Sequence, residues 1–355
     1  MVTPQEVFEE LKKVKYPGFN RDIVSFGMVK DIEVGSMGVT VILAPTTMRD
    51  DVLHQIRDAV TTAVRQMPGA PAVEIAITEP EQPQRRMQAG PAGVPGVSHV
   101  IAVASGKGGV GKSTVAVNLA LALIGLGKRV GLLDCDVYGP SVPLMLGLKE
   151  RPKSTEDRRI VPLHKYGLTV ISLGLFVEDH TPIIWRGPMI NKLLTQFLRD
   201  VDWGELDYLV LDLPPGTGDA QLTIVQQVPL SGGVIVTTPQ DVALLDVKRG
   251  IAMFQQVKAP VLGVIENMSY HICGGCGERA EIFGHGGGEA MARQFDIPLL
   301  GEIPLVRDVR EAADAGKPLV LAQPDHPQSQ VFRSIAARLL AEVAAQPAQA
   351  LPTIH

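Results

Sequence analysis

Cysteine is scarce in this 355-residue sequence, which contains only Cys135, Cys273 and Cys276. Three thiols are too few for a disulfide framework, so the sequence predicts a protein of a reducing compartment, the cytoplasm. Cys273 and Cys276 are close in sequence, and any special thiol chemistry is expected from that pair.

Long apolar runs and runs of one charge are also missing. No stretch approaches the roughly 20 apolar residues that span a bilayer, and the N-terminal MVTPQEVFEELKKVKYPG has no apolar core of signal-peptide length. The 33 basic and 38 acidic residues give a net charge of -5, without a concentration of either sign. We therefore expect no membrane span, no polybasic membrane patch and no broad binding to nucleic acid.

The composition indicates two domains joined by a linker. Residues 80–98 are rich in proline and glycine, which is typical of an extended linker. Residues 1–79 predict a helix, a strand pair broken near residues 35–38, a second helix and a strand at 72–78. This region is expected to be a small α/β accessory domain, and residues 346–355 a flexible tail.

Residues 99–345 alternate apolar strands with helices. The strand-like segments are VIAVA, RVGLLD, LTVISL, YLVLD, GVIVTT, VLGVIEN and a final IPL segment. Continuous Val, Ile and Leu runs separated by helices are typical of a parallel sheet covered on both faces. We predict a doubly wound, mostly parallel α/β fold whose ligand binds at the carboxyl ends of the strands.

The stretch ASGKGGVGKST, residues 104–114, matches the phosphate-binding loop of P-loop NTPases. It lies between the strand VIAVA and the apolar helix TVAVNLALALIG, as the pattern requires. Glycines let backbone N–H groups surround phosphate oxygens at a helix N-terminus. Lys112 is predicted to hold the β- and γ-phosphates and Ser113 to bind Mg²⁺. The other loop residues expected to contact the nucleotide are Gly106, Lys107, Gly108, Gly109, Val110, Gly111 and Thr114.

Polar residues after later strands fit the same site. Asp212 ends the strand YLVLD, where a carboxylate can hold Mg²⁺ through water, and the loop PPGTGD that follows could sense the γ-phosphate. The amide of Asn267 can donate and accept, which matches the N7/N6 edge of adenine. Because no Lys-x-Asp follows Asn267, ATP is favoured over GTP. Pro304 is predicted to wall the base.

The second lysine, Lys107, departs from the ordinary loop. GKGGVGKST resembles the variant loop of the MinD/ParA/nitrogenase-reductase class of ATPases, in which the extra lysine reaches the nucleotide of the other subunit of a dimer. The resemblance implies that Lys107 acts with Lys112 across a homodimer. It also implies that Asp136, in LLDCDVYGPS, orients the attacking water and that Asp134 supports the metal. A solvated rim lysine and a solvated acidic turn are the alternatives.

The motif HICGGCG places Cys273 and Cys276 on a glycine-rich loop, where two thiolates can converge on one metal. Two thiolates leave a site incomplete. The alternatives are a redox disulfide, a zinc site completed by His271 or His285, and a site shared at a two-fold axis. Four thiolates from two subunits would suit a 4Fe-4S cluster or zinc. Cys135, beside apolar strand residues, is expected to fill the core.

Together, GKGGVGKST, LLDCDVYGPS, WRGP at 185–188, DLPPGTGD, ENMSY, CGGCG and EIFGHGGG resemble the Mrp/ApbC family of iron-sulfur cluster carrier ATPases over about residues 98–345. The resemblance implies a homodimer that binds a labile 4Fe-4S cluster at its paired Cys-x-x-Cys loops and delivers it to apo iron-sulfur proteins. It implies slow ATP hydrolysis coupled to this transfer.

The N-terminal domain resembles a small domain found in iron-sulfur cluster-assembly factors. Members of that domain family often carry a cysteine before the second helix, but the corresponding stretch here, APTTMRDD, has none. A docking role is therefore expected instead of metal binding, and the sequence does not identify the partner that the domain docks.

The alternative function is a MinD/ParA-like positioning or regulatory ATPase without a cluster role. It calls for a basic amphipathic C-terminal helix or a basic DNA-binding face. VFRSIAARLLAEVAA has apolar residues at helical spacing but only two arginines, so a helix packed on the core is favoured. Its apolar positions are Phe332, Ile335, Leu339 and Val343.

Overall fold

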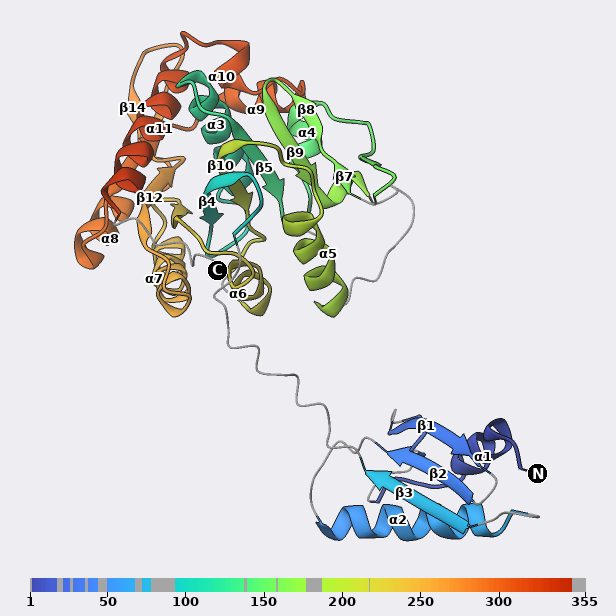
Figure 1. Ribbon diagram of the computed structural model, residues 1–355. Helices are drawn as coiled ribbons and strands as arrows, with labels where there is room; N and C mark the ends of the chain where they lie inside the picture. Colours follow the sequence, from blue (N-terminus) through green and yellow to red (C-terminus); the bar gives the residue numbers. More distant parts are fainter. Residues whose placement is uncertain are drawn as a thin grey trace. The chain divides into compact units, whose positions relative to one another are not determined.

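The computed structural model describes residues 2–17, 22–25, 28–35, 38–43, 50–67, 72–77, 93–136, 139–157, 159–176, 187–216 and 218–346. The chain divides into two compact units, Met1–Gln88 and Ala89–His355 (Figure 1). Most of the predicted linker, the predicted tail beyond residue 346 and the stretch 44–49 before the second helix lie outside the described residues.

The first unit is a three-stranded sheet with two helices. Its strands have the order β1-β2-β3, with β1 antiparallel and β3 parallel to β2. The helix α1 begins after Thr3, whose side chain forms a capping box with Glu6. The elements predicted for this region are confirmed, and their bounds are α1 Pro4–Leu11, β1 Val29–Val34, β2 Gly38–Leu43, α2 Asp50–Arg65 and β3 Ala72–Ile77.

The core of the first unit lies between the two helices and the sheet. The apolar residues Ile56, Val60 and Val64 recur every four positions along α2 and are buried, as are Val39 and Val41 on one face of β2. The two periods, four on the helix and two on the strand, bring both apolar faces together.

The second unit contains an eight-stranded sheet of order β15-β12-β11-β4-β10-β5-β9-β8. All neighbouring strands are parallel except β8 and β9, which confirms the predicted mostly parallel fold. The strands are β4 Val97–Ala104, β5 Val130–Asp134, β8 Leu163–Lys165, β9 Leu168–Ser172, β10 Leu206–Asp212, β11 Gly232–Thr237, β12 Val261–Asn267 and β15 Leu299–Ile303.

Helices cover both faces of this sheet (Figure 1). The helices α3 and α11 pack on one face, and α5, α6, α7 and α8 contribute to the core on the other. The helix bounds are α3 Lys112–Gly125, α4 Val142–Leu146, α5 Gly187–Arg199, α6 Asp219–Val225, α7 Asp241–Gln256, α8 Gly287–Phe295, α9 Arg307–Asp314, α10 Leu319–Ala322 and α11 Pro327–Ala345; a 3₁₀ turn, η1, spans Leu173–Leu175.

Alternate residues of the strand β10 pack into the two cores on opposite faces of the sheet. Leu209 and Leu211 pack with the helices on one face, and Tyr208 and Val210 pack with α3 and α11 on the other. Because successive strand residues point to opposite faces, a strand buried on both sides must be apolar throughout. The run YLVLD meets this requirement up to Asp212, where the strand ends at the edge that holds the site.

Three features differ from or extend the sequence prediction. The strand β4 begins at Val97, inside the predicted linker, because Val97 pairs with Leu206 of β10. The edge strand β8 was not predicted. Two short hairpins were not predicted either, β6 Lys153–Ser154 with β7 Ile160–Val161, and β13 His271–Ile272 with β14 Arg279–Ala280.

The C-terminal helix α11 packs on the sheet as predicted. Phe332, Ile335, Leu339 and Val343 are buried in the core that α11 shares with α3. Among the helices of the described ranges, none has the length and apolar character that crossing a membrane takes.

Candidate functional site

The phosphate loop connects β4 to α3 at the carboxyl edge of the large sheet. A cavity of about 220 Å³ lies against it, and Asp136, Ser141 and Pro215 from neighbouring loops complete its wall. The lining residues from the loop itself are Ser105, Lys107, Gly108, Gly109, Val110, Gly111, Lys112, Ser113 and Thr114. The structure thus gathers the predicted loop residues around one recess, with Gly106 at the start of the loop.

Gly111 is required both by its backbone and by its surroundings. Its φ is +77°, which disfavours a side chain, and an added Cβ would collide with the amide nitrogen of Asn267. That amide donates to the carbonyl of Val110 at 2.8 Å. Asn267 therefore holds the loop from behind instead of lining the cavity.

Pro304 lies just beyond β15. It is buried, and its carbonyl accepts a hydrogen bond from Nε2 of Gln328 at 2.8 Å. It is not among the residues that line the loop cavity. Contacts of Asn267 and Pro304 with an adenine base therefore stay predictions.

Lys112, which lines the cavity, forms a buried ion pair with Asp212. The Lys112 side chain is 5% exposed and Asp212 is fully buried, and Nζ of Lys112 also donates to the hydroxyl of Ser113 at 3.2 Å. Burial raises the pKa of Asp212, and the nearby ammonium opposes that rise. The charge on Lys112 is thus balanced within the chain.

The residues around Asp212 fit a bound Mg²⁺. Its Oδ1 is paired with Lys112, but within the described residues its buried Oδ2 has no hydrogen-bond partner. The hydroxyl of Ser113 lies beside the same pair. Carboxylate and hydroxyl oxygens are ligands that Mg²⁺ prefers, often through water, so Asp212 and Ser113 are suited to the predicted metal role.

The two acids after β5 occupy different positions. Asp134 is fully buried, and its carboxylate accepts hydrogen bonds from the backbone N–H of Asp136 at 3.1 Å and from the hydroxyl of Ser172 at 2.8 Å. Burial, and then the charge of Asp212, raise the pKa of Asp134 to about 7. Asp136 lines the cavity. It can therefore approach a bound nucleotide, whereas Asp134 supports the site from behind.

Lys107 is half-buried at the cavity wall. Its Nζ donates to Oε1 of Gln240 at 2.9 Å, and Gln240 is the N-cap residue of α7. Nothing in the sequence around Gln240 predicted this contact, because it depends on the adjacency of β4 and β11. The ammonium of Lys107 is thus held by a loop of its own chain.

Cys273 and Cys276 lie on the turn between β13 and β14. The backbone N–H of Cys273 donates to the carbonyl of Glu278 at 2.9 Å, and that of Gly277 donates to the carbonyl of Cys273 at 2.9 Å. Both thiols are free, Cys276 is exposed and Cys273 is half-buried. Backbone N–H groups of Cys276 and Gly275 lower the pKa of Cys273, which favours a thiolate at the turn.

The described part of one chain does not complete a metal site at this turn. No group of three or more His, Cys, Asp or Glu side chains within it is arranged to hold a metal ion. His271 shares a hydrogen bond with the carbonyl of Leu305 at 2.9 Å, and His285 lies 3.2 Å from Glu281. The third cysteine, Cys135, is buried in the core, as expected.

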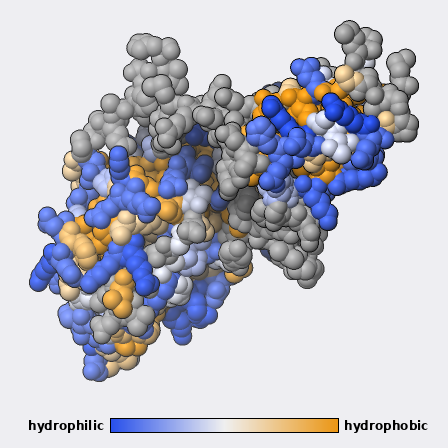
Figure 2. Space-filling model, turned by 90° about the horizontal axis from the view of Figure 1, so that it is seen from below, coloured by the Kyte–Doolittle hydropathy of each residue, from blue (hydrophilic) through white to orange (hydrophobic). Residues whose placement is uncertain are grey.

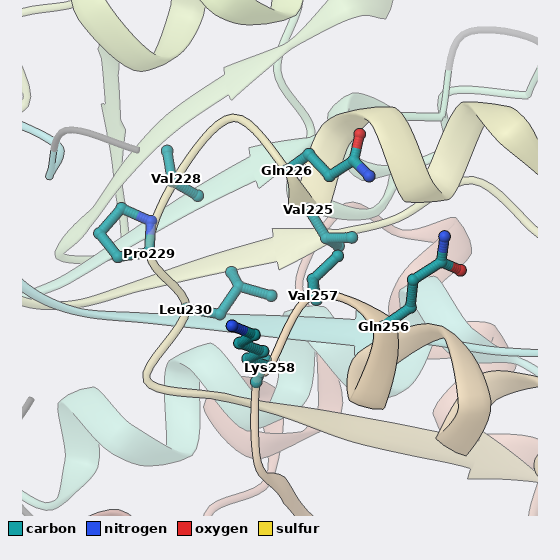
Figure 3. Close-up of a pocket in the computed structure, with 9 residues that line it drawn as sticks. Val225, Gln226, Val228, Pro229, Leu230, Gln256, Val257 and Lys258 are labelled. Carbon is teal, nitrogen blue, oxygen red and sulfur yellow. The ribbon is translucent and has the colours of Figure 1, made fainter. Parts of the chain in front are cut away.

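A second recess, of about 310 Å³, lies at the opposite edge of the sheet (Figure 3). It is formed by the segments that precede β11 and β12, where Val225, Pro229 and Leu230 face Val257 and Lys258. Its lining contains no carboxylate and none of the predicted site residues. The loop cavity is therefore the recess that matches the predicted nucleotide chemistry.

Two protein families match this chain. The family described as NUBPL iron-transfer P-loop NTPase matches residues 96–340, and the family described as iron-sulfur cluster assembly protein matches residues 4–77. The two matches correspond to the two units of the structure.

Individual relatives agree with the family matches. Iron-sulfur cluster carrier proteins of Synechocystis sp. and Aquifex aeolicus are 42% and 45% identical to this chain. The alignments cover 97% and 96% of this chain, respectively, and 98% of each relative. A solved nucleotide-binding protein from Archaeoglobus fulgidus, in complex with ADP, is 38% identical with a TM-score of 0.59, and the match covers 67% of this chain and 93% of that one.

Proposed function

This chain belongs to the family of iron-transfer P-loop NTPases, and from that premise we propose that it carries a 4Fe-4S cluster between the subunits of a homodimer. The cluster is its cargo, delivered to apo iron-sulfur proteins, and slow ATP hydrolysis is coupled to the transfer. The observation that carries this proposal is the hairpin with two free thiols at the same sheet edge as the phosphate loop.

The half-filled ligand set supports a shared site. A 4Fe-4S cluster takes four thiolates, and Cys273 and Cys276 supply two. The lowered pKa of Cys273 and the exposure of Cys276 suit two turns that meet across a two-fold axis. The same chemistry suits zinc, so the identity of the metal is decided by the reconstitution described below.

Exposed apolar side chains support a dimer through the carboxyl edge of the sheet. Figure 2 shows apolar areas among polar ones on the surface of the large unit. Large apolar residues that are about half exposed or more come from the loops and first helical turns at this edge: Leu144, Met189, Leu245, Ile272 and Ile282. Apolar surface concentrated beside a functional site is typical of an interface.

The proposed ATP chemistry divides among five residues. Lys112 exchanges Asp212 for the β- and γ-phosphates, and Asp136, at the cavity wall, orients the attacking water. Asp212 and Ser113 would hold Mg²⁺, which neutralises phosphate charge when bound. Lys107 leaves Gln240 and reaches the nucleotide of the other subunit, so that hydrolysis depends on dimerisation.

The remaining parts of the chain fit a cytoplasmic carrier better than a positioning ATPase. A positioning ATPase needs an apolar helix face that is free to attach to a surface, whereas the apolar face of α11 is buried. The first unit matches a cluster-assembly family, and we propose that it docks apo-proteins or assembly factors.

Anaerobic reconstitution with iron and sulfide tests the proposed cargo. The wild type is expected to gain iron-sulfur absorption with about four irons per two chains. A double variant Cys273→Ala, Cys276→Ala is expected to gain none. The matched control is Cys135→Ala, which removes the buried core thiol and is expected to keep the cluster.

Two results would contradict the proposal. One is equal iron-sulfur absorption in the wild type and in the double-cysteine variant. The other is a single chain in sedimentation experiments on the reconstituted, nucleotide-saturated protein without oxygen. Zinc at the two thiols without iron uptake would replace the proposed cluster with a structural metal.

A further inference from the structure

Glu266 lies at the end of β12, which contacts the nucleotide loop through Asn267 and leads along the chain to the cysteine hairpin. Glu266 is the penultimate residue of β12, is fully buried and pairs in register with Thr237 of β11 and Glu302 of β15. A buried carboxyl group is costly unless it is hydrogen bonded. Its partners therefore define what it holds in place.

Both carboxyl oxygens of Glu266 accept hydrogen bonds from segments outside β12. Oε1 accepts from the hydroxyl of Ser269 at 2.6 Å, and Oε2 accepts from the backbone N–H of Gly288 at 2.5 Å. Ser269 starts the segment that leads to the cysteine hairpin, and Gly288 lies in the first turn of α8. One side chain thus joins the hairpin stem and a helix to the end of the strand.

The approach of α8 to Glu266 depends on glycine at position 288. A Cβ added to Gly288 would lie 2.9 Å from Oε2 and 3.0 Å from Cβ of Glu266. These distances are shorter than ordinary contacts, so a side chain would displace the carboxyl group or the helix. Close packing against Glu266 therefore explains the last glycine of the motif EIFGHGGG, Gly288.

The next residue, Asn267, connects the same strand end to the nucleotide loop. Its amide donates to the carbonyl of Val110, and it fills the space beside Gly111, where both loop residues line the cavity. Successive strand residues point to opposite faces, so Asn267 contacts the loop while Glu266 contacts α8. A movement of the loop therefore also moves the end of β12.

The chain from Asn267 to the hairpin is a constrained link. Met268 has a φ of +55°, a conformation that is strained for a residue with a side chain and must be held by its surroundings. The N–H of Ser269 donates to the carbonyl of Ile303 at 3.0 Å, and that of Leu305 to the carbonyl of Tyr270 at 2.7 Å. The hairpin stem therefore follows the strand end.

We infer that Glu266 is the positioning residue that transmits nucleotide occupancy of the loop to the cysteine pair. The inference rests on the proposed function for what the pair carries. The coupling itself needs only nucleotide binding and two reactive thiols. The carboxyl group of Glu266 makes the strand end, the hairpin stem and the first turn of α8 move together. The two thiols therefore change position or exposure when the loop closes on phosphate.

The test is the rate at which iodoacetamide alkylates Cys273 and Cys276 in the full-length, metal-free protein, with and without Mg-ADP. In the wild type we expect ADP to change this rate by about fivefold, the lower end of coupling between distant sites. Buried Cys135 is the internal reference for unfolding. Glu266→Gln replaces one acceptor oxygen with a donor, and it is expected to retain ADP binding but lose the effect of ADP on the rate.

A second variant and a matched control complete the test. Ser269→Ala removes only the bond to the hairpin stem, is expected to lose the effect of ADP, and decides the matter if Glu266→Gln does not fold. Thr237→Val is the control, because Thr237 is a buried polar residue paired with Glu266. Among the described residues its hydroxyl donates to the carbonyl of the next residue, Thr238, and to no part of the hairpin stem or α8. It is expected to retain the effect.

The inference is overturned if ADP leaves alkylation of the wild type unchanged, or if Ser269→Ala responds to ADP as the wild type does. Neither readout uses iron, so the inference and the proposed cargo fail separately. Normal coupling without cluster uptake would refute the cargo alone. A normal cluster in a protein whose thiols ignore ADP would refute the coupling alone.

Discussion

Replacing Asp134 by Asn is expected to stabilise the nucleotide-free protein. Asp134 is fully buried beside Asp212, and its burial and that neighbouring charge raise its pKa from 3.8 to about 7. Its two oxygens accept from the N–H of Asp136 and the hydroxyl of Ser172. Asparagine can keep both contacts, because its oxygen accepts from the N–H and its amide donates to the hydroxyl oxygen.

The magnitude follows from proton linkage. One pKa unit corresponds to about 1.4 kcal/mol, so keeping Asp134 ionised in the folded protein costs up to about 4 kcal/mol above pH 7. Because its pKa is raised in the fold, its contribution to stability is greatest below the unfolded pKa of 3.8 and is lost as the pH rises through about 7. The advantage of Asp134→Asn should therefore grow by about 2–3 kcal/mol between about pH 5 and pH 8.

Urea denaturation at these two pH values, in EDTA and without nucleotide, measures the effect. Both tryptophans, at positions 185 and 203, belong to the second unit, so tryptophan fluorescence follows the unfolding of that unit alone. The control is Asp207→Asn, because the hydrogen-bonded guanidinium of Arg129 lowers the pKa of Asp207 to about 2. Loss of that charge is expected to destabilise slightly.

The reasoning about Asp134 is refuted by either of two outcomes. The first is a variant Asp134→Asn that is less stable than the wild type at pH 8. The second is a stability difference that stays constant between the two pH values, since a constant difference would mean that the aspartate does not take up a proton in this range.

Two further predictions concern the phosphate loop. Gly111→Ala is expected to weaken ADP binding in calorimetry more than Gly109→Ala, because both add a side chain at positive φ, about 1–2 kcal/mol, but only at position 111 does the new Cβ meet Asn267; equal losses would rule out the contact as the cause. Lys107→Ala is expected to keep ADP binding and to lose dimer-dependent phosphate release by about 10³-fold, the lower range for a cation supplied across an interface. Unchanged turnover would place Lys107 on a solvated rim.

The fold could be predicted where strands are long and buried on both sides. Runs such as YLVL, before Asp212, are apolar throughout, as a strand in a sheet covered on both faces requires. The strand β8 and the two short hairpins were missed, because strands of two or three residues are too short to show a period and lie at exposed edges. The boundary of β4 was missed because the pairing of Val97 with Leu206 depends on a distant segment.

The candidate site divides in the same way. The loop residues could be predicted because their spacing is local, and the structure gathers them around one cavity. Contacts between loops could not, since they depend on which strands are neighbours. Lys107 meets Gln240 because β4 lies beside β11, and Asp134 meets Ser172 because β5 lies beside β9. Strand order is therefore the information that local patterns lack.

The buried pair of Lys112 and Asp212 bears on the stability of the protein without nucleotide. A buried ammonium without a partner would destabilise the fold, but here Lys112 already has a carboxylate partner. A phosphate that binds Lys112 must compete with this carboxylate. The favourable free energy of phosphate binding from Lys112 is therefore the difference between the Lys112–phosphate pair and the Lys112–Asp212 pair. The fold is therefore stable without a nucleotide, and the protein can release a nucleotide without unfolding.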